Sequence, residues 1–140
     1  MSLALVLAPV FVQVALTLAL LLWLGTSRVR SIRAGVVHVR DVALGQPNWP
    51  APLLQIANAY RNQFELPVLF YLVMVLALFS AHATTGLMVL AWLFVASRLL
   101  HALIHVTTNN MQRRFFLFLA GALILIVMWL LFLFEVVSAP

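Results

Sequence analysis

Four polar residues stand at the start of a long apolar segment, within the stretch NAYRNQFELP at positions 58–67. On a helix Asn58, Arg61, Asn62 and Glu65 share one face, because side chains three, four and seven positions apart are neighbours. Even on the lowest scales, a central arginine or acid in lipid costs roughly 2.5 to 3.5 kcal/mol. We therefore expect this face to contact protein or water. We interpret it as a candidate functional site, with a purely structural Arg61–Glu65 ion pair as the alternative.

A second polar face is predicted about forty residues later. Arg98, His101 and His105 are three and seven positions apart, so they also share one side of a helix. Two polar half-helices that run in opposite directions avoid lipid by facing each other, so we expect the two faces to meet. Together with Arg114, and with Arg30 or Arg33, they would form a cationic pocket. Arginine donates forked hydrogen bonds to carboxylate or phosphate, so the pocket favours a small anion or a lipid headgroup.

A metal or haem site is a third possibility for these side chains. Histidines four positions apart on a helix can share a metal, and His101 and His105 have that spacing, with Glu65 as a further ligand. The nearby guanidinium groups of Arg61 and Arg98 would repel a cation. We therefore expect no metal here.

The composition restricts the class of protein. Of 140 residues, 66% are hydrophobic and only 8% are charged, which indicates a polytopic membrane protein. The formal net charge of +5 would suggest nucleic acid as the partner of a soluble domain. In a membrane protein it reports topology and anionic ligands, so we expect no nucleic acid. The chain has no cysteine, which excludes a cysteine nucleophile or thiolate ligands on it.

The elements that must position these residues follow from hydropathy. We predict an all-α fold, one domain over residues 1–140, with four transmembrane helices at about 3–24, 54–80, 87–107 and 115–137. The basic segment 25–53 is predicted to be a loop, because glycines and prolines interrupt it. Pro67 should kink the second helix just beyond the polar cluster. Gln13 and Thr17 should face into the bundle and hydrogen-bond there.

The arginines predict the orientation. Five of the eight basic residues lie between Arg28 and Arg61, and Arg113 and Arg114 follow the third helix. By the positive-inside rule both of these connections are cytoplasmic, so both termini are expected on the other side.

These motifs resemble the MAPEG family, the membrane-associated proteins of eicosanoid and glutathione metabolism. The most specific element is R-N-x-x-E at Arg61, Asn62 and Glu65. The pattern RxxHxxxH from Arg98 to His105, which ends nine residues before Arg114, is moderately specific. The resemblance covers nearly the whole chain, including the basic first loop and the order of the four helices.

The resemblance implies a homotrimer that binds glutathione between neighbouring subunits, in the cytoplasmic half of the membrane. It assigns Arg61, Asn62, Glu65 and His101 to glutathione binding, and Arg114 to stabilising the thiolate. A nearby guanidinium favours the charged form of a thiol, whose ordinary pKa is about 8.5. The implied activity is that of a glutathione transferase or peroxidase acting on lipophilic substrates.

The sequence departs from the glutathione-using members at two positions. Asn58 stands where they often have arginine, and His105 stands where they often have tyrosine, although imidazole can also donate a hydrogen bond to a thiol. The short spacing from Glu65 to Pro67 indicates a bacterial branch, and so the inner membrane. The alternative is a non-catalytic protein with the same fold, either a lipid-binding scaffold or an accessory subunit of a larger membrane complex.

Overall fold

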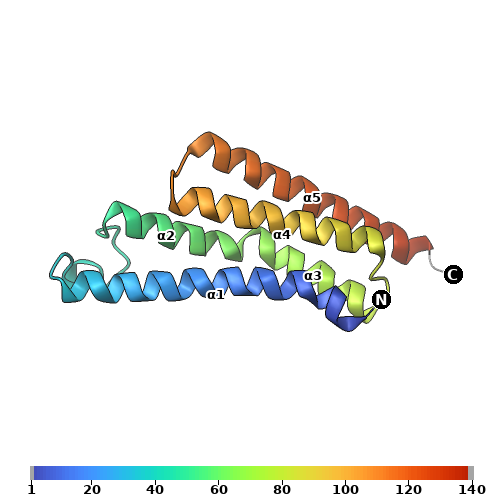
Figure 1. Cartoon of the computed structure of the whole chain (residues 1–140), viewed down its shortest axis with the longest axis horizontal. Coiled ribbons are helices and arrows are strands. Elements are labelled where there is room, and N and C mark those ends of the chain that lie inside the picture. The colour runs from blue at the N-terminus through green and yellow to red at the C-terminus, as the bar shows by residue number, and fades with distance from the viewer. Residues whose placement is uncertain (1, 139–140) are drawn as a thin grey trace.

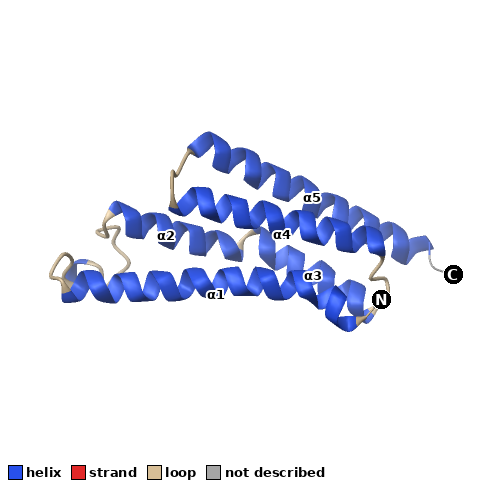
Figure 2. Cartoon of the chain, in the orientation of Figure 1, coloured by secondary structure: helices blue, strands red, loops and turns tan. Residues whose placement is uncertain are grey.

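A computed structural model describes residues 2–138, so the ends of the predicted domain lie outside the described residues. Its helices are α1 (Leu3–Arg33), α2 (Ala51–Arg61), α3 (Leu66–Phe79), α4 (Thr85–Val106) and α5 (Met111–Ser138). In this part of the chain every regular element is helical (Figure 2). Four segments are long and apolar enough to span a membrane, with Ala51–Phe79 counted as one span. The predicted all-α bundle of four membrane-spanning segments is confirmed.

The arrangement places the arginine-rich connections together. Figure 1 shows the α1–α2 loop and the α4–α5 turn at one end of the bundle, while both ends of the described chain lie at the other. α4 packs along α5, and α1 and α2 lie beside α4. The residues expected to do chemistry therefore come from elements that converge on one end of the molecule.

The predicted loop over 25–53 is wrong in its first third, because α1 continues through Gly25 to Arg33. The helix stops at Gly35, whose φ of +69° is the left-handed conformation that glycine adopts without cost. The backbone N–H of Val36 donates to the Ser31 carbonyl at 3.0 Å, the bond that defines a Schellman cap. Arginine is a good helix former, so Arg28, Arg30 and Arg33 are helical residues.

The predicted kink at Pro67 is instead a break inside the polar cluster. α2 ends at Arg61, a 3₁₀ turn covers Asn62–Phe64, and α3 begins at Leu66. Proline tolerates the first turn of a helix but clashes with the carbonyl four residues earlier when it lies inside one. The chain resolves this conflict by starting a new helix just before Pro67. α2 also begins earlier than predicted, at Ala51, with Pro52 in its first turn.

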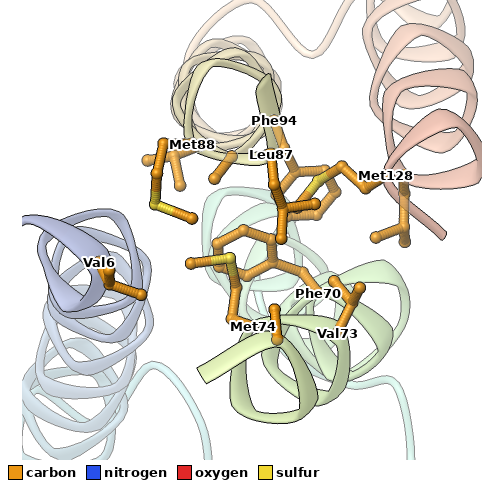
Figure 3. Packing of buried hydrophobic residues seen from close by; sticks show 12 residues of the cluster. Val6, Phe70, Val73, Met74, Leu87, Met88, Phe94 and Met128 are labelled. Carbon is orange, nitrogen blue, oxygen red and sulfur yellow. The ribbon is translucent and has the colours of Figure 1, made fainter. Parts of the chain in front are cut away.

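The apolar core lies where all four spans meet, toward the end that holds the termini (Figure 3). Phe70 of α3 stacks on Phe94 of α4 with ring centroids 4.7 Å apart. Val6 of α1 and Met128 of α5 contribute from the two outer helices. This packing fixes the helices relative to one another, and so fixes the polar residues at the opposite end.

One glycine sets the distance between α4 and α5. A Cβ at Gly121 would lie 2.9 Å from Ser97 Oγ and 3.7 Å from Arg98 Cδ. Ser97 Oγ itself donates to the Phe94 carbonyl at 2.6 Å. The close approach permitted by Gly121 is what encloses Arg98 between the two helices.

We predict that Gly121→Ala lowers the free energy of unfolding by about 1 to 3 kcal/mol, the usual effect of overpacking. The matched control is Gly86→Ala, where the added Cβ meets only Leu131 Cδ2 at an ordinary 3.5 Å. Thermal unfolding in detergent measures both. Equal melting temperatures for the two variants would contradict the assigned role, whereas relief of the defect by Ser97→Ala would support it.

Candidate functional site

The predicted polar face of α2 is exposed and not buried inside the bundle. Asn58, Arg61 and Glu65 are exposed on the protomer, and Asn62 is half-buried. Asn62 Nδ2 donates to the Asn58 carbonyl at 3.1 Å. The only ion pair among residues 2–138 joins Arg40 to Asp41 in the loop, so the predicted Arg61–Glu65 pair is wrong. The break between the two residues removes the one-turn spacing that would have brought them together.

The residue of this stretch that does face the bundle is Gln63, which was not among the predicted site residues. Gln13 Nε2 donates to Gln63 Oε1 at 2.9 Å, and Gln63 Nε2 donates to the Ala59 carbonyl at 3.0 Å. Both side chains are buried. The inward orientation and core hydrogen bond predicted for Gln13 are therefore present, and Thr17 Oγ1 donates to its carbonyl at 3.1 Å. This pair ties the broken segment between α2 and α3 to α1.

The predicted face of α4 is buried inside the protomer. Arg98, His101 and His105 are 0%, 2% and 1% exposed. Arg98 Nη2 donates to the Asn62 carbonyl at 3.3 Å, so α4 does meet the polar segment that follows α2. On its other side Arg98 Cζ lies 5.9 Å from the centre of the Phe118 ring of α5. The two polar elements thus meet where the Arg98 side chain bonds the Asn62 backbone, while the side chains of Asn58, Arg61 and Glu65 stay exposed.

Several buried nitrogens in this cluster have no hydrogen-bond partner. They are Arg98 Nε and Nη1, His101 Nδ1, and both ring nitrogens of His105. The rings of His101 and His105 are 5.7 Å apart, edge to face. A buried donor without an acceptor costs about 1 to 3 kcal/mol, and more when it is charged. Within residues 2–138, Arg98 therefore has N–H donors, and the histidines a donor or acceptor nitrogen each, without a partner.

Arg114 lies in the first turn of α5, which begins earlier than predicted. It is half-buried, and its Nη1 donates to Asn109 Oδ1 at 2.7 Å. Asn109 has a φ of +49°, a conformation that asparagine tolerates better than most residues and that closes the α4–α5 turn. The turn therefore holds the guanidinium at the arginine-rich end of the bundle. Arg113, its neighbour in sequence, is exposed.

A polar cavity of about 570 Å³ lies between α1, α2 and the loop that joins them. Arg28 of α1 lines it with Asn58 and Arg61 of α2. Arg28 Cζ also lies 5.1 Å from the centre of the Trp49 ring, a cation–π contact that anchors the loop. The volume falls within the range of small-molecule sites. Arg28 was not among the predicted site residues, because its participation depends on α1 remaining helical beyond Gly25.

Arg30 or Arg33 was predicted to join the cationic pocket, but neither lines the polar cavity of the protomer. Both are exposed and line a different hollow, formed by α1 alone. Around a helix, Arg28 faces a different direction from the residues two and five positions later. No group of three or more histidine, aspartate or glutamate side chains in the described chain is placed to hold a metal ion.

Residues 6–134 match the family model of the MAPEG family. The chain belongs to the MAPEG family. It is an integral membrane protein of the family that acts in eicosanoid and glutathione metabolism, and the predicted resemblance is confirmed. The match extends from the first turns of α1 to the last turns of α5, so it includes every site residue described above. No curated protein and no solved structure matches the chain.

Proposed function

We propose that the protein assembles as a homotrimer, binds glutathione between subunits, and acts as a glutathione transferase or peroxidase on lipophilic substrates from the bilayer. The compartment that fits the sequence is a bacterial inner membrane. The observation that carries the proposal is the exposure of Asn58, Arg61 and Glu65 in a membrane-spanning segment. Such a face requires protein or water against it, and a second copy of a MAPEG chain provides that cover.

The site offers the groups that glutathione requires. Glutathione carries two carboxylates, an ammonium group and a thiol. Arg61 and Arg28 supply forked donors for carboxylates, and the amide of Asn58 adds neutral donors and an acceptor. Glu65, exposed just beyond the break, would supply a counter-charge for the ammonium group. The buried guanidinium of Arg98 lies behind the Asn62 backbone and gives this region a positive potential.

Arg114 is the proposed catalytic residue. Its guanidinium would hold the thiol in the charged form by lowering the pKa of the sulfur. In a transfer reaction, the thiolate forms a bond to an electrophilic carbon while the leaving group departs with the electron pair. In a peroxidase reaction, two glutathione molecules are oxidised to the disulfide while a hydroperoxide is reduced to an alcohol and water. His105 offers a nearby imidazole that can donate to the sulfur.

One observation favours the non-catalytic alternative, a lipid-binding scaffold or an accessory subunit. His101 and His105 are both buried, with the His101 ring centre 6.2 Å from that of Phe118 of α5, so the protomer does not expose their imidazoles. In this alternative the cluster would hold the bundle together and no turnover would occur.

Thermal unfolding with and without glutathione tests the proposal. A ligand selective for the folded state raises the free energy of unfolding, by about 2.7 kcal/mol at one hundred times its Kd, and the melting temperature rises with it. We expect saturable stabilisation by glutathione, and a cross-linked mass of three chains. A monomeric mass, or no shift at millimolar glutathione, would contradict the proposal. Stabilisation without turnover across a panel of electrophiles and hydroperoxides would favour the scaffold.

A further inference from the structure

One amide interrupts the apolar stripe by which α1 packs into the bundle. The buried positions of α1 lie along one face of the helix and are Val6, Pro9, Gln13, Leu20 and Leu24. Gln13 is 0% exposed and lies between the apolar cluster that includes Val6 and the one that includes Leu20. A buried amide costs free energy unless it is hydrogen-bonded, so the partner of Gln13 restricts how α1 can pack.

That partner is Gln63, in the break between α2 and α3. Gln63 is the buried residue of the 3₁₀ turn, and its Oε1 accepts from Gln13 Nε2 at 2.9 Å. Its own Nε2 donates to the Ala59 carbonyl at 3.0 Å. Ala59 lies in the last turn of α2, where carbonyls lack partners within the helix. One side chain therefore joins α1 to the end of α2 and to the break.

The break is also held from α4. The carbonyl of Asn62, the residue before Gln63, accepts from Arg98 Nη2 at 3.3 Å. Two consecutive residues of the turn are thus bonded to two different helices, one through its backbone and one through its side chain. Arg61 lies just before the turn and Glu65 just after it, and both are exposed. The spacing between Arg61 and Glu65 therefore depends on how the turn is held.

Apolar packing alone selects the register of α1 poorly in a bilayer. Lipid tails are as apolar as leucine, so leucine contacts between helices gain little over contacts with lipid. The cluster beside the pair is small, and its buried members are Leu20, Ala59 and Ala102. A slip of α1 by one residue turns Gln13 by about 100° around the helix and moves it about 1.5 Å along the axis. Such a slip would bury two amides without their bond.

We propose that Gln13 and Gln63 are positioning residues. Their hydrogen bond sets the register of α1 against the broken span, Ala51–Phe79, and so fixes where Arg61 and Glu65 stand. A single buried asparagine specifies register in coiled coils in the same way, at a cost in stability. The register itself needs no ligand. Its consequence for glutathione rests on the proposed function, which assigns Arg61 and Glu65 to that ligand.

Leucine replacements separate register from stability. Gln13→Leu or Gln63→Leu alone leaves the other amide without this partner, so each should lower the melting temperature. The double variant removes both amides and should recover most of that loss, because replacing both partners by apolar groups of similar size is nearly neutral. Gln55→Leu, the same change at a half-buried position of α2, is the control. Losses that simply add in the double variant would show that the two amides are not coupled, and would overturn the proposal.

Cysteine reactivity measures the register without glutathione, because the chain has no cysteine of its own. Leu20→Cys and Ala59→Cys each place one thiol where α1 packs against α2, at positions that are 4% and 0% exposed. Reaction with N-ethylmaleimide is followed by mass. We expect both thiols to be protected when Gln13 and Gln63 are present, and to react about fivefold faster or more in the double leucine variant.

Met128→Cys, buried in the other apolar cluster, is the control for this measurement and should stay protected in both backgrounds. Full protection of Leu20→Cys and Ala59→Cys in the double leucine variant would overturn the register role. An equal gain in reactivity at Met128→Cys would show general loosening of the bundle and would overturn it as well.

Glutathione affinity tests the consequence for the site. The double leucine variant keeps Arg61 and Glu65, and we expect its Kd to rise about fivefold or more, the cost of ordering two side chains on binding. Gln55→Leu should bind like the unmodified protein. Unchanged affinity in the double variant, with Leu20→Cys reactive, would overturn the link to the site. Absence of binding by the unmodified protein would instead remove the proposed function, and the cysteine reactivities would still decide the register.

Discussion

Replacement of Arg61 by alanine is expected to abolish saturable glutathione binding while leaving the fold intact. Arg61 is exposed on the protomer and lines the polar cavity with Asn58 and Arg28, so its removal leaves no hole in the core. Truncating one partner of a desolvated charge pair costs about 2 to 5 kcal/mol, at least roughly 30-fold in affinity. Calorimetry on detergent-purified protein measures the loss.

The control for Arg61→Ala is Arg40→Ala. The side chain of Arg40 is 83% exposed in the α1–α2 loop, and its removal changes the net charge by the same amount. We expect that variant to bind glutathione almost normally. If Arg61→Ala and Arg40→Ala bind equally well, the outward face of α2 is not the glutathione site.

Arg114→Ala is expected to reduce glutathione-dependent turnover by roughly 10²-fold or more, the usual effect of removing one group that stabilises developing or resident negative charge. Glutathione binding and oligomeric mass should stay close to those of the unmodified protein. Arg114 Nη1 donates to Asn109 Oδ1 at 2.7 Å, which holds the guanidinium at the arginine-rich end of the bundle. Arg113→Ala is the matched control, because Arg113 is adjacent and exposed.

The pH dependence separates an effect on the thiolate from a structural effect. A guanidinium that lowers the pKa of the bound thiol keeps turnover high below the ordinary thiol pKa of about 8.5. Without it the thiol should ionise at higher pH, so the turnover of Arg114→Ala should recover as pH rises toward and beyond that value. Uniformly low turnover at every pH, with binding also lost, would indicate damage to the site instead. Unchanged turnover would remove Arg114 from the mechanism.

The fold could be predicted from the composition of the chain and the spacing of its polar residues. Hydropathy alone defined the four spans, because a bilayer imposes a minimum apolar length that is visible in any sequence. The distribution of arginine predicted that both basic connections lie at one end, and Figure 1 shows them there. The motif at Arg61, Asn62 and Glu65 was specific enough to indicate the family, which the match over residues 6–134 confirms.

Helix ends were predicted less well, because local backbone geometry decides them. Gly25 looked like a stop but lies inside α1, whereas Gly35 ends that helix in a left-handed conformation with a Schellman cap. Both glycines lie within three residues of an arginine, so their sequence contexts look alike. The structure separates them, because Gly35 and Val36 donate to the Ile32 and Ser31 carbonyls and so end the helix. The two extra turns carry Arg28 to the polar cavity and Arg30 and Arg33 to the opposite side of α1.

What the sequence by itself determined is which residues are polar within an apolar span, and so which positions cannot face lipid. Helical periodicity groups side chains on one face, but it does not say whether that face points into the bundle or out of it. The tertiary structure decided this: Gln63 turns inward to Gln13, and the face with Arg61 turns outward. The physical reason is burial: Gln63 continues the buried stripe of Ile56 and Ala59, three and seven positions along the same face. The break before Pro67 then leaves the Asn62 carbonyl to accept from the buried Arg98.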